Sequence, residues 1–326
     1  MSAVHDAQTT ASELVRELTS EIKAKVVLTT GVSPKSLGAT FVETIAKAEP
    51  ALLILAGRNP AKVSQTADAI KAANPNVKTR VLELDLSSLD AVRRAADVVL
   101  SWADVPHIDV LVNSAGIMAV DFKLSPDGYE NHLATNYLGP WLFTNLIINK
   151  ILASKSPRIV NVSSDGHRLN PIRWDDYNFQ NGANYNKWFA YGQSKTANIL
   201  FSLSLAEKLG SRGLQTYSLH PGVIATNLGD HIDWEEGIPS LQAADRALGN
   251  KEGWAPFNWK TSDQGAATFV YAAFDPNLKD HNGAYLEDSH VADPLVETVK
   301  PWATSKIEAG RLWKLTEKLV GQEIQY

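Results

Sequence analysis

The 326-residue sequence predicts a single α/β domain built on a doubly wound parallel sheet. Short runs rich in Val, Ile and Leu alternate along the chain with longer segments of helical pattern. Near-continuous apolar strands separated by helices are typical of a parallel sheet that is covered on both faces. Because the crossovers in such sheets are right-handed, few arrangements other than a doubly wound one remain.

Six strands are predicted, with helical segments between them. The strands are expected at Lys25–Thr30, Ala51–Ala56, Lys78–Leu84, Ile108–Val112, Arg158–Val162 and Leu214–Leu219. The helices are expected at Gly38–Lys47, from Pro60 onward, at Ser88–Trp102 and in a segment that opens at Tyr191. Proline favours the first position of a helix because its fixed backbone angle suits a helix start, which supports the helix from Pro60.

No internal repeat or flexible linker divides the chain, so residues 1–326 are interpreted as one domain. Residues 1–24 are predicted to form an amphipathic N-terminal helix, 25–290 the core, and 291–326 a C-terminal extension with an amphipathic helix. Residues 228–262 are rich in Trp, Pro and Gly and are predicted to be irregular. They are either an aromatic lid over an apolar ligand or an insertion whose tryptophans pack onto the body.

Composition and charge exclude several classes of protein. The chain is 44% hydrophobic and 21% charged, has no cysteine and carries a net charge of −5. A disulfide scaffold, a thiolate nucleophile and a Cys-ligated metal are therefore excluded, and there is no basic surplus for nucleic acid. No His, Asp and Glu residues have metal-ligand spacing, no apolar run spans a bilayer, and the N-terminus fits no signal peptide. We expect a cytoplasmic protein with no metal, no nucleic-acid partner and no membrane span.

The loop between the first predicted strand and the first helix, Thr30–Gly38, predicts binding of a dinucleotide. A glycine-bearing turn there lets backbone N–H groups and a helix N-terminus meet a pyrophosphate. After the second strand stands Arg58, with no Asp or Glu where an NAD enzyme would hold the ribose 2′-hydroxyl. A planar guanidinium suits a 2′-phosphate, so NADP(H) is the expected cofactor, and Lys35 could add a second positive charge. The alternative is that both side chains are solvated surface charges.

Tyr191 and Lys195 lie four positions apart, on one face of a predicted helix. A phenol with a pKa of about 10 is a poor acid–base catalyst at neutral pH, and a nearby ammonium group lowers that pKa. A tyrosine so placed can give a proton to a developing alkoxide or take one from an alcohol. Because this spacing also occurs by chance, the interpretation depends on the neighbouring segments.

Three further segments follow predicted strands at the same edge of the sheet. Ser163 and Ser164 end the fifth strand and could donate a hydrogen bond to a carbonyl oxygen beside the tyrosine. The small residues of Asn113–Gly116, after the fourth strand, would let a ribose approach the backbone. His220–Thr226, after the sixth strand, could present a backbone group and a hydroxyl to a carboxamide. Their joint placement indicates a single site.

In this order the motifs resemble those of the short-chain dehydrogenase/reductase family, over roughly residues 24–290. The similarity is greatest to the branch that contains retinol dehydrogenases, WW-domain oxidoreductases and their fungal relatives. The motifs are Thr30-Gly31, Leu37-Gly38, Asp85, Asn113–Gly116, Asn136–Gly139, Ser163-Ser164, Tyr191 with Lys195, and Pro221-Gly222. The resemblance implies a Rossmann fold and hydride transfer between nicotinamide C4 and the substrate carbon, without a metal.

The resemblance also implies a role for individual residues. Tyr191 would be the general acid or base, Lys195 would lower its pKa and bind the nicotinamide ribose, and Ser164 would polarise the substrate oxygen. Asn136 would hold a water that links Lys195 to solvent. Asp85 and Leu86 would contact the adenine, and Ile224 and Thr226 the carboxamide. The complete set of expected cofactor contacts is Gly31, Ser33, Lys35, Ser36, Leu37, Gly38, Arg58, Asp85, Leu86, Asn113, Ala115, Gly116, Tyr191, Lys195, Pro221, Ile224 and Thr226.

The glycine turn departs from the family pattern. It has one extra residue, and Ser36 stands where the middle glycine is usual. The side chains of Ser33, Lys35 or Ser36 are therefore candidates to replace backbone contacts with the cofactor.

These observations together predict an NADP(H)-dependent oxidoreductase. We expect a carbonyl reductase that acts reversibly on the carbonyl or secondary alcohol of an apolar small molecule, aromatic ones included. The alternatives are a C=C bond reductase, in which the same tyrosine and lysine would deliver a proton, and a nucleotide-binding regulatory protein with little turnover. Family members often form dimers or tetramers through helix packing; a homodimer is a further expectation, although the C-terminal extension could block or replace that contact.

Overall fold

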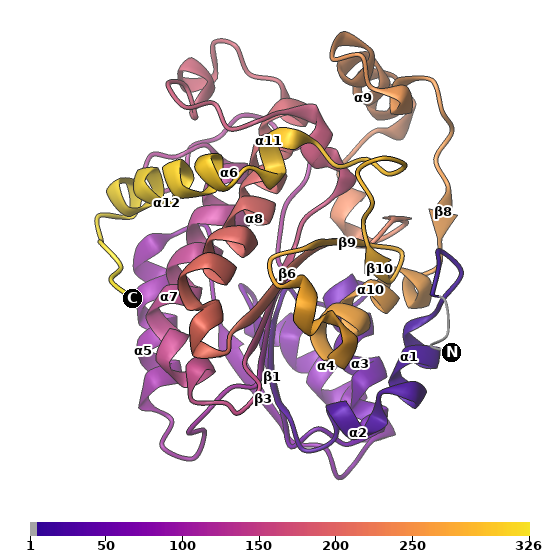
Figure 1. Ribbon diagram of the computed structural model, residues 1–326, viewed down its shortest axis with the longest axis vertical. Coiled ribbons are helices and arrows are strands. Elements are labelled where there is room, and N and C mark those ends of the chain that lie inside the picture. Colours follow the sequence, from indigo (N-terminus) through magenta and orange to yellow (C-terminus); the bar gives the residue numbers. More distant parts are fainter. Residues whose placement is uncertain (1–4) are drawn as a thin grey trace.

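An eight-stranded sheet forms the centre of the computed structural model, in which residues 5–326 are described (Figure 1). Its order is β3-β2-β1-β4-β5-β6-β9-β10, and all neighbours are parallel except β9 and β10. The strands are β1 (Val26–Thr30), β2 (Leu52–Gly57), β3 (Thr79–Glu83), β4 (Val110–Asn113), β5 (Arg158–Val162), β6 (Gln215–His220), β9 (Tyr285–Glu287) and β10 (His290–Val291). The predicted doubly wound fold is confirmed, and the strand order reverses between β1 and β4, where such sheets bind ligands.

Helices cover both faces of the sheet (Figure 1). The first half of the chain contains α1 (Ala11–Glu17), α2 (Thr19–Ile22), α3 (Leu37–Ile45), α4 (Pro60–Ala73), α5 (Leu89–Ser101), α6 (Asn131–Leu133) and α7 (Gly139–Leu152). The second half contains α8 (Lys187–Leu209), α9 (Trp234–Ala247), α10 (Ser262–Phe274), α11 (Pro301–Thr304) and α12 (Lys306–Val320). One core cluster lies between the sheet and α5, α7, α8 and α12, and the other between the sheet and α1, α3, α4 and α10.

Local sequence explains why these elements begin where they do. All five residues of β1 are buried, as expected for a strand with helices on both faces. Side chains cap the helices that follow the strands: Ser36 caps α3, Asn59 caps α4 ahead of Pro60, and Ser88 caps α5. Each cap accepts a hydrogen bond from a backbone N–H that has no partner inside the helix, which fixes the first turn at the edge of the sheet.

The structure differs from the sequence prediction in several elements. Residues 1–24, predicted as one helix, contain two short ones, α1 and α2, and residues 1–4 lie outside the described range. Residues 228–262, predicted to be irregular, contain the 14-residue helix α9 and the two-residue strand β8 (Trp259–Lys260), which pairs with β7 (Val223–Ile224). Helix α8 begins at Lys187, where Asn186 caps it, so Tyr191 lies in its second turn rather than at its start. Strand β9 was not predicted, because three residues are too short for a recognisable period.

The C-terminal extension forms the predicted amphipathic helix, α12, and its buried face completes the core beside α7 and α8. The Trp313 ring packs edge-on against Trp141 of α7, with the ring centroids 5.0 Å apart. Thr316 of α12 shares a hydrogen bond with the Tyr137 hydroxyl over 2.7 Å. The extension is therefore part of the folded domain. Figure 1 shows α12 in yellow, beside α7 and α8.

Replacing Trp313 by alanine should destabilise the fold by about 3–5 kcal/mol, because the side chain is 2% exposed and leaves a large cavity. Urea unfolding followed by circular dichroism measures this change. Ile307→Ala on the same helix is the matched control, since Ile307 is 76% exposed and should change stability by less than about 0.5 kcal/mol. Equal stabilities for both variants would contradict the role assigned to α12.

Candidate active site

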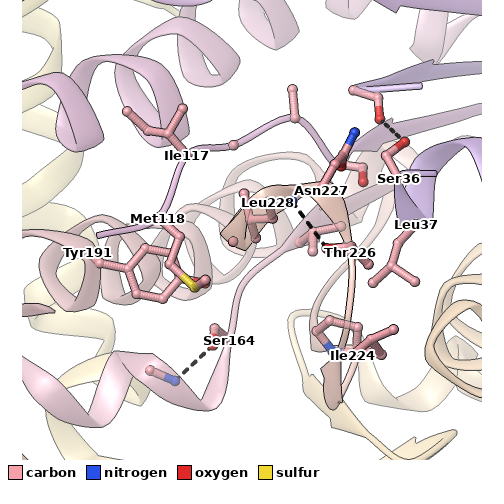
Figure 2. Close-up of a pocket in the computed structure, with 18 of the residues that line it drawn as sticks. Ser36, Leu37, Ile117, Met118, Ser164, Tyr191, Ile224, Thr226, Asn227 and Leu228 are labelled. Atoms are coloured by element: carbon pink, nitrogen blue, oxygen red, sulfur yellow. Dashed lines mark hydrogen bonds between the residues drawn. The ribbon is translucent and has the colours of Figure 1, made fainter. Parts of the chain in front are cut away.

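A cleft of about 1080 Å³ opens at the carboxyl edge of the sheet, between the loops that follow β1 to β6 and the segment that contains α9. Its walls include most of the predicted site residues: Gly31, Ser33, Lys35, Ser36, Leu37, Arg58, Asp85, Leu86, Ala115, Gly116, Ser164, Tyr191, Lys195, Pro221, Ile224 and Thr226. Figure 2 shows the two ends of this cleft, with Ser36 and Leu37 at one end and Tyr191 and Ser164 at the other. Gly38, Asn113 and Asn136 do not line it.

The glycine turn packs tightly against the loop after β4. Gly31 has a φ of +75°, and a Cβ at this position would lie 2.6 Å from the Cα of Ala115. A Cβ at Gly38 would lie 2.6 Å from the carbonyl oxygen of Gly31, so Gly38 allows α3 to approach the turn although it does not line the cleft. The N-terminus of the nine-residue helix α3 therefore faces the cleft, in the arrangement that suits a pyrophosphate.

Ser36 has a structural role in this turn. Its hydroxyl donates a hydrogen bond to the Gly31 carbonyl oxygen over 2.8 Å and accepts one from the Ala39 N–H over 3.1 Å, so it is committed within the chain (Figure 2). The extra residue is accommodated at Lys35, whose φ of +67° places it in the left-handed region. The lengthened turn thus keeps a capped helix N-terminus at the cleft.

Two cations lie at the same end of the cleft. Arg58 directly follows β2, Lys35 lies in the glycine turn, and both side chains are exposed and line the cleft. Among residues 5–326 neither forms an ion pair. The carboxylate of Asp85, after β3, accepts hydrogen bonds from the backbone and hydroxyl of Ser87 and so shapes its own turn. Because no acidic side chain of residues 5–326 forms an ion pair with Arg58, its guanidinium is available to bind an anion.

Helix α8 carries Tyr191 and Lys195 into the opposite end of the cleft. The Lys195 ammonium lies 5.5 Å from the centre of the Tyr191 ring and donates a hydrogen bond to the Val162 carbonyl oxygen over 3.0 Å. Burial lowers the pKa of Lys195 to about 8. Burial raises the pKa of Tyr191 to about 12, although hydrogen bonding to Ser164 acts in the opposite direction. In the chain without a cofactor, Tyr191 is therefore a protonated phenol at neutral pH.

Ser164 stands beside the tyrosine at the end of β5. Its hydroxyl accepts a hydrogen bond from the Gly166 N–H over 2.9 Å and donates one to Asp165 over 3.2 Å. A Cβ on Gly166 would lie 2.9 Å from the Tyr191 ring and 3.1 Å from the Ser164 oxygen. The absence of a side chain at Gly166 thus allows the hydroxyl and the ring to approach the same point, below Met118 in Figure 2.

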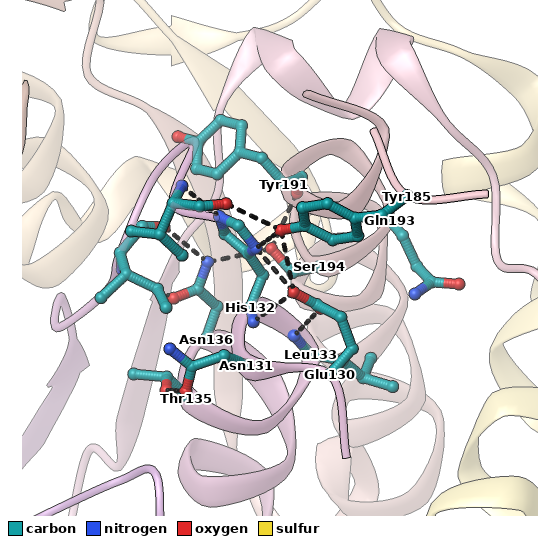
Figure 3. Close-up of polar contacts among 12 residues, drawn as sticks. Glu130, Asn131, His132, Leu133, Thr135, Asn136, Tyr185, Tyr191, Gln193 and Ser194 are labelled. Carbon is teal, nitrogen blue, oxygen red and sulfur yellow. Dashed lines mark hydrogen bonds and ion pairs between the residues drawn. The ribbon is translucent and has the colours of Figure 1, made fainter. Parts of the chain in front are cut away.

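Asn136 lies behind the cleft wall, in a short π-helical segment before α7. Its side chain accepts from the Ile117 N–H over 2.8 Å and donates to the Ile117 carbonyl over 3.0 Å and to the Ser194 hydroxyl over 2.9 Å (Figure 3). A Cβ on Gly116 would lie 3.2 Å from the Asn136 oxygen and 3.7 Å from the Lys195 nitrogen, so Gly116 lies between them. Asn113 lies deeper, where it donates to Thr144 and Asn161.

A buried Glu–His pair that was not predicted holds the loop at Val120, close to Tyr191 (Figure 3). His132 contacts Glu130 over 2.8 Å through Nδ1, and its Nε2 accepts from the Val120 N–H over 3.4 Å. The Tyr185 hydroxyl donates to the Val120 carbonyl oxygen over 2.9 Å. Both polar groups of the Val120 backbone are thus fixed, and Val120 lines the cleft.

Apolar side chains form a further part of the cleft wall, called here the apolar chamber. Its walls are Met118, Val120, Leu169, Trp188, Ile232, Trp234, Leu241, Phe257 and Trp259. Several of these residues, including Leu241 of α9, belong to an apolar cluster that is separate from the two main cores. Of the three tryptophans in residues 228–262, Trp234 and Trp259 line the cleft and are also partly exposed to solvent, whereas Trp254 is exposed and does not line it. Trp188 of α8 lines the cleft as well. The tryptophans of this segment are thus divided, since two of them line the cleft and one does not.

Sequence reasoning also missed Asp165 and Arg168, which line the cleft beside Ser164. The signal was present, since both lie within four residues of the predicted serine, but charged residues in a turn usually point into solvent. Within residues 5–326, no cluster of His, Asp and Glu has the placement of a metal site. None of the helices in this range combines the length and apolar character that crossing a membrane requires.

Comparisons with known proteins agree with this geometry. The model of the short chain dehydrogenase family matches residues 25–178. Short-chain dehydrogenase/reductase prx1 of Penicillium rubens is 35% identical over 97% of this chain and 91% of its own length, and Retinol dehydrogenase 11 of Homo sapiens is 33% identical over 94% and 89%. The crystal structure of an uncharacterized protein from Mycobacterium Paratuberculosis superposes with a TM-score of 0.68 at 27% identity, covering 94% of this chain and 98% of the other.

Replacing Gly31 by alanine should weaken the binding of a nicotinamide cofactor at least tenfold, because the new methyl group would displace the Ala115 backbone. Quenching of tryptophan emission during titration with NADPH and NADH measures the dissociation constants. Gly213→Ala is the matched control: its φ of +86° imposes similar backbone strain, of about 1–2 kcal/mol, but nothing lies within 4 Å of its Cβ. Equal dissociation constants for both variants and the native protein would contradict the assignment of the turn.

Proposed function

The chain belongs to the short-chain dehydrogenase family, and from this premise we propose that it is an NADPH-dependent carbonyl reductase for apolar small molecules, aromatic ones included. As a member of the family it is an oxidoreductase that acts on alcohols or carbonyls with a nicotinamide cofactor. The observation that carries the proposal is the convergence of Tyr191, Ser164 and Lys195 in the same cleft as the apolar chamber.

The residues at the two ends of the cleft fit a nicotinamide dinucleotide. The absence of a Cβ at Gly31 and Gly38 permits the close packing that brings the N-terminus of α3 to the cleft, where it would hold the pyrophosphate. Lys195 donates one hydrogen bond, to Val162, and an ammonium has three hydrogens, so two donors remain for the ribose hydroxyls. A bound nicotinamide would supply the hydride for reduction, or accept it in the reverse direction.

The chain's own residues would handle the proton. Tyr191, a protonated phenol at neutral pH, would donate its proton to the developing alkoxide. The single hydroxyl proton of Ser164, which Asp165 accepts in this structure, would turn to the same oxygen when the substrate binds. The positive charge of Lys195 would favour the phenolate left on Tyr191. In alcohol oxidation the same groups would act in reverse, with the phenolate as the base.

The position of Arg58 favours NADPH over NADH. The guanidinium lies at the end of β2, where a 2′-phosphate on the adenine ribose would come, and Lys35 lies in the adjacent turn. The planar donor fork of arginine matches the oxygens of a phosphate group. With no acidic side chain directly after β2, the site lacks the acceptor that a free 2′-hydroxyl would use.

The chamber favours an apolar substrate. Its aromatic and aliphatic walls would remove water from the reacting carbonyl and contact the body of the substrate. The human relative Retinol dehydrogenase 11 is named after retinol, an alcohol with a long apolar chain. A substrate of that kind would suit such a chamber. A carbonyl group attached to an aromatic ring or a conjugated chain is therefore the substrate class that we propose.

Arg58→Ala should raise the dissociation constant for NADPH about tenfold or more and leave that for NADH unchanged, because a charge-assisted hydrogen bond contributes ~1.5–3 kcal/mol. Titration of tryptophan emission with each cofactor measures both values. Arg94→Ala, an exposed arginine of α5 outside the cleft, is the control and should change neither. Tight NADH binding that is insensitive to Arg58→Ala would overturn the assignment of NADPH.

The purified protein should oxidise NADPH in the presence of all-trans-retinal or of an aromatic ketone, as followed by absorbance at the nicotinamide band. Tyr191→Phe should lower kcat by ~10²–10⁴, because the proton donor is lost. Tyr177→Phe, outside the cleft, should not change it. An α,β-unsaturated ketone in the same panel identifies the bond that is reduced: an allylic alcohol, seen by NMR, supports the proposal, whereas a saturated ketone or no turnover contradicts it.

A further inference from the structure

Arg168 occupies a buried position between the catalytic serine and the lid. It belongs to the 3₁₀ turn Asp165–Leu169, for which Ser164 is the N-cap, and only 2% of the residue is exposed. Burial of a guanidinium costs hydration free energy, which only hydrogen-bonded carboxylates nearby can offset. Three carboxylates do so here, and they come from three different elements.

The strongest of these contacts reaches the lid. Asp245 of α9 accepts two hydrogen bonds from Arg168, from Nε over 2.8 Å and from Nη2 over 2.9 Å. The Asp245 side chain is 1% exposed and does not line the cleft. Glu252, just after α9, lies 3.7 Å from the same Nε. Asn250 reinforces the junction, since its amide donates to the Arg168 carbonyl and to Asp245.

The other side of the guanidinium reaches the catalytic serine. Arg168 Nη1 lies 2.6 Å from Asp165 Oδ2, while Asp165 Oδ1 accepts the hydrogen bond from the Ser164 hydroxyl. Burial by itself raises the pKa of Asp165, but His220, Arg168 and other neighbours lower it to about 2. Asp165 is therefore an anion at neutral pH, and it accepts the one hydroxyl proton of Ser164 until a substrate oxygen takes its place as acceptor.

We propose that Arg168 is a positioning residue, which couples the seating of the lid helix α9 to the placement of the Ser164 hydroxyl through Asp165. When α9 packs over the chamber, Asp245 fixes one edge of the guanidinium, and the other edge then fixes the Asp165 carboxylate. Lysine could not replace it, because a single ammonium lacks the donor fork that engages two carboxylates from opposite directions. The inference depends on the role of Ser164 in the proposed function.

Through this coupling, the packing of α9 would affect the rate of the reaction as well as the binding of the substrate. The apolar walls supplied by α9, such as Leu241 and Trp234, contact the space for the substrate. The Arg168 chain connects that packing with the hydroxyl that would hold the substrate oxygen. Because catalysis depends steeply on the placement of reacting groups, a small shift of Ser164 should lower kcat more than it changes cofactor affinity.

The test is a set of isosteric variants that remove one charge at a time. Asp165→Asn and Asp245→Asn should each lower kcat about tenfold with the carbonyl compound that the native enzyme reduces fastest, and the dissociation constant for NADPH should not change. In a Ser164→Ala background neither substitution should lower kcat further, because the group that they position is absent. Asp176→Asn, which breaks the Arg173–Asp176 pair outside the cleft, is the matched control and should have no effect in either background.

The outcomes separate the inference from the proposed function. If Asp245→Asn leaves kcat unchanged, or lowers it by the same factor with and without the Ser164 hydroxyl, Arg168 holds the lid but does not position the serine, and the inference is overturned. If Ser164→Ala itself retains native activity, the role of Ser164 in the proposed function is overturned, and the inference with it.

Hydrogen exchange tests the coupling without any substrate. Asp245→Asn should speed exchange in α9 and also at the Gly166 and His167 amides, which are bonded to Ser164. Asp176→Asn should speed exchange at neither place. Faster exchange confined to α9, with the Ser164 turn unchanged, would contradict a chain of contacts that passes through Arg168.

Discussion

The cleft depends on the close approach of the two loops that follow β1 and β4. The Thr30 hydroxyl accepts hydrogen bonds from the N–H groups of Ser114 and Ala115, over 3.1 and 3.0 Å, and Gly31 brings its backbone against Ala115. These strands are neighbours where the strand order reverses, so the contact fixes the edge from which both halves of the site project. The helix N-terminus on one side and the loop before Asn136 on the other take their positions from it.

A second constraint is the burial of Lys195. The end of β5 is bound to α8 by three hydrogen bonds, from Ser163 to the Lys195 carbonyl and from Lys195 and Asn198 to the Val162 carbonyl. They hold the ammonium beside Tyr191, where no carboxylate of residues 5–326 lies within ion-pair distance of it. Burial without a counter-charge explains the lowered pKa of Lys195. A bound dinucleotide, with its negative phosphates and its hydroxyl acceptors, would raise the pKa of Lys195 and so stabilise its ammonium form. The cofactor would thus supply the interactions that the buried ammonium lacks within the chain.

The sequence predicted the structure best where a pattern of residues is compatible with few kinds of local structure. The apolar, β-branched runs of β1 to β6 predicted the sheet, and the residues at their ends predicted most of the cleft wall. Helix α9 could not be predicted, because Pro239 and a Trp- and Gly-rich composition disfavour a helix that tertiary packing nevertheless stabilises. The role of Arg168 could not be predicted either: its place close to Ser164 in the sequence is visible, but its partners Asp245 and Glu252 are distant in sequence and meet it only in the folded chain. Long-range polar contacts of this kind have no period that a sequence pattern could show.

The glycine turn shows how a departure from a family pattern can preserve its function. A side chain in place of the middle glycine would be expected to interfere with a phosphate, but the Ser36 hydroxyl turns inward to the Gly31 carbonyl and caps α3. The extra residue is taken up by the left-handed backbone of Lys35, which leaves the register of Leu37 and Gly38 on the helix intact. The first N–H groups of a helix have no acceptor within it, and Ser36 satisfies only that of Ala39. The N–H groups of Leu37 and Gly38 lie ahead of Ala39, so the altered turn keeps donors of the kind that would suit a pyrophosphate.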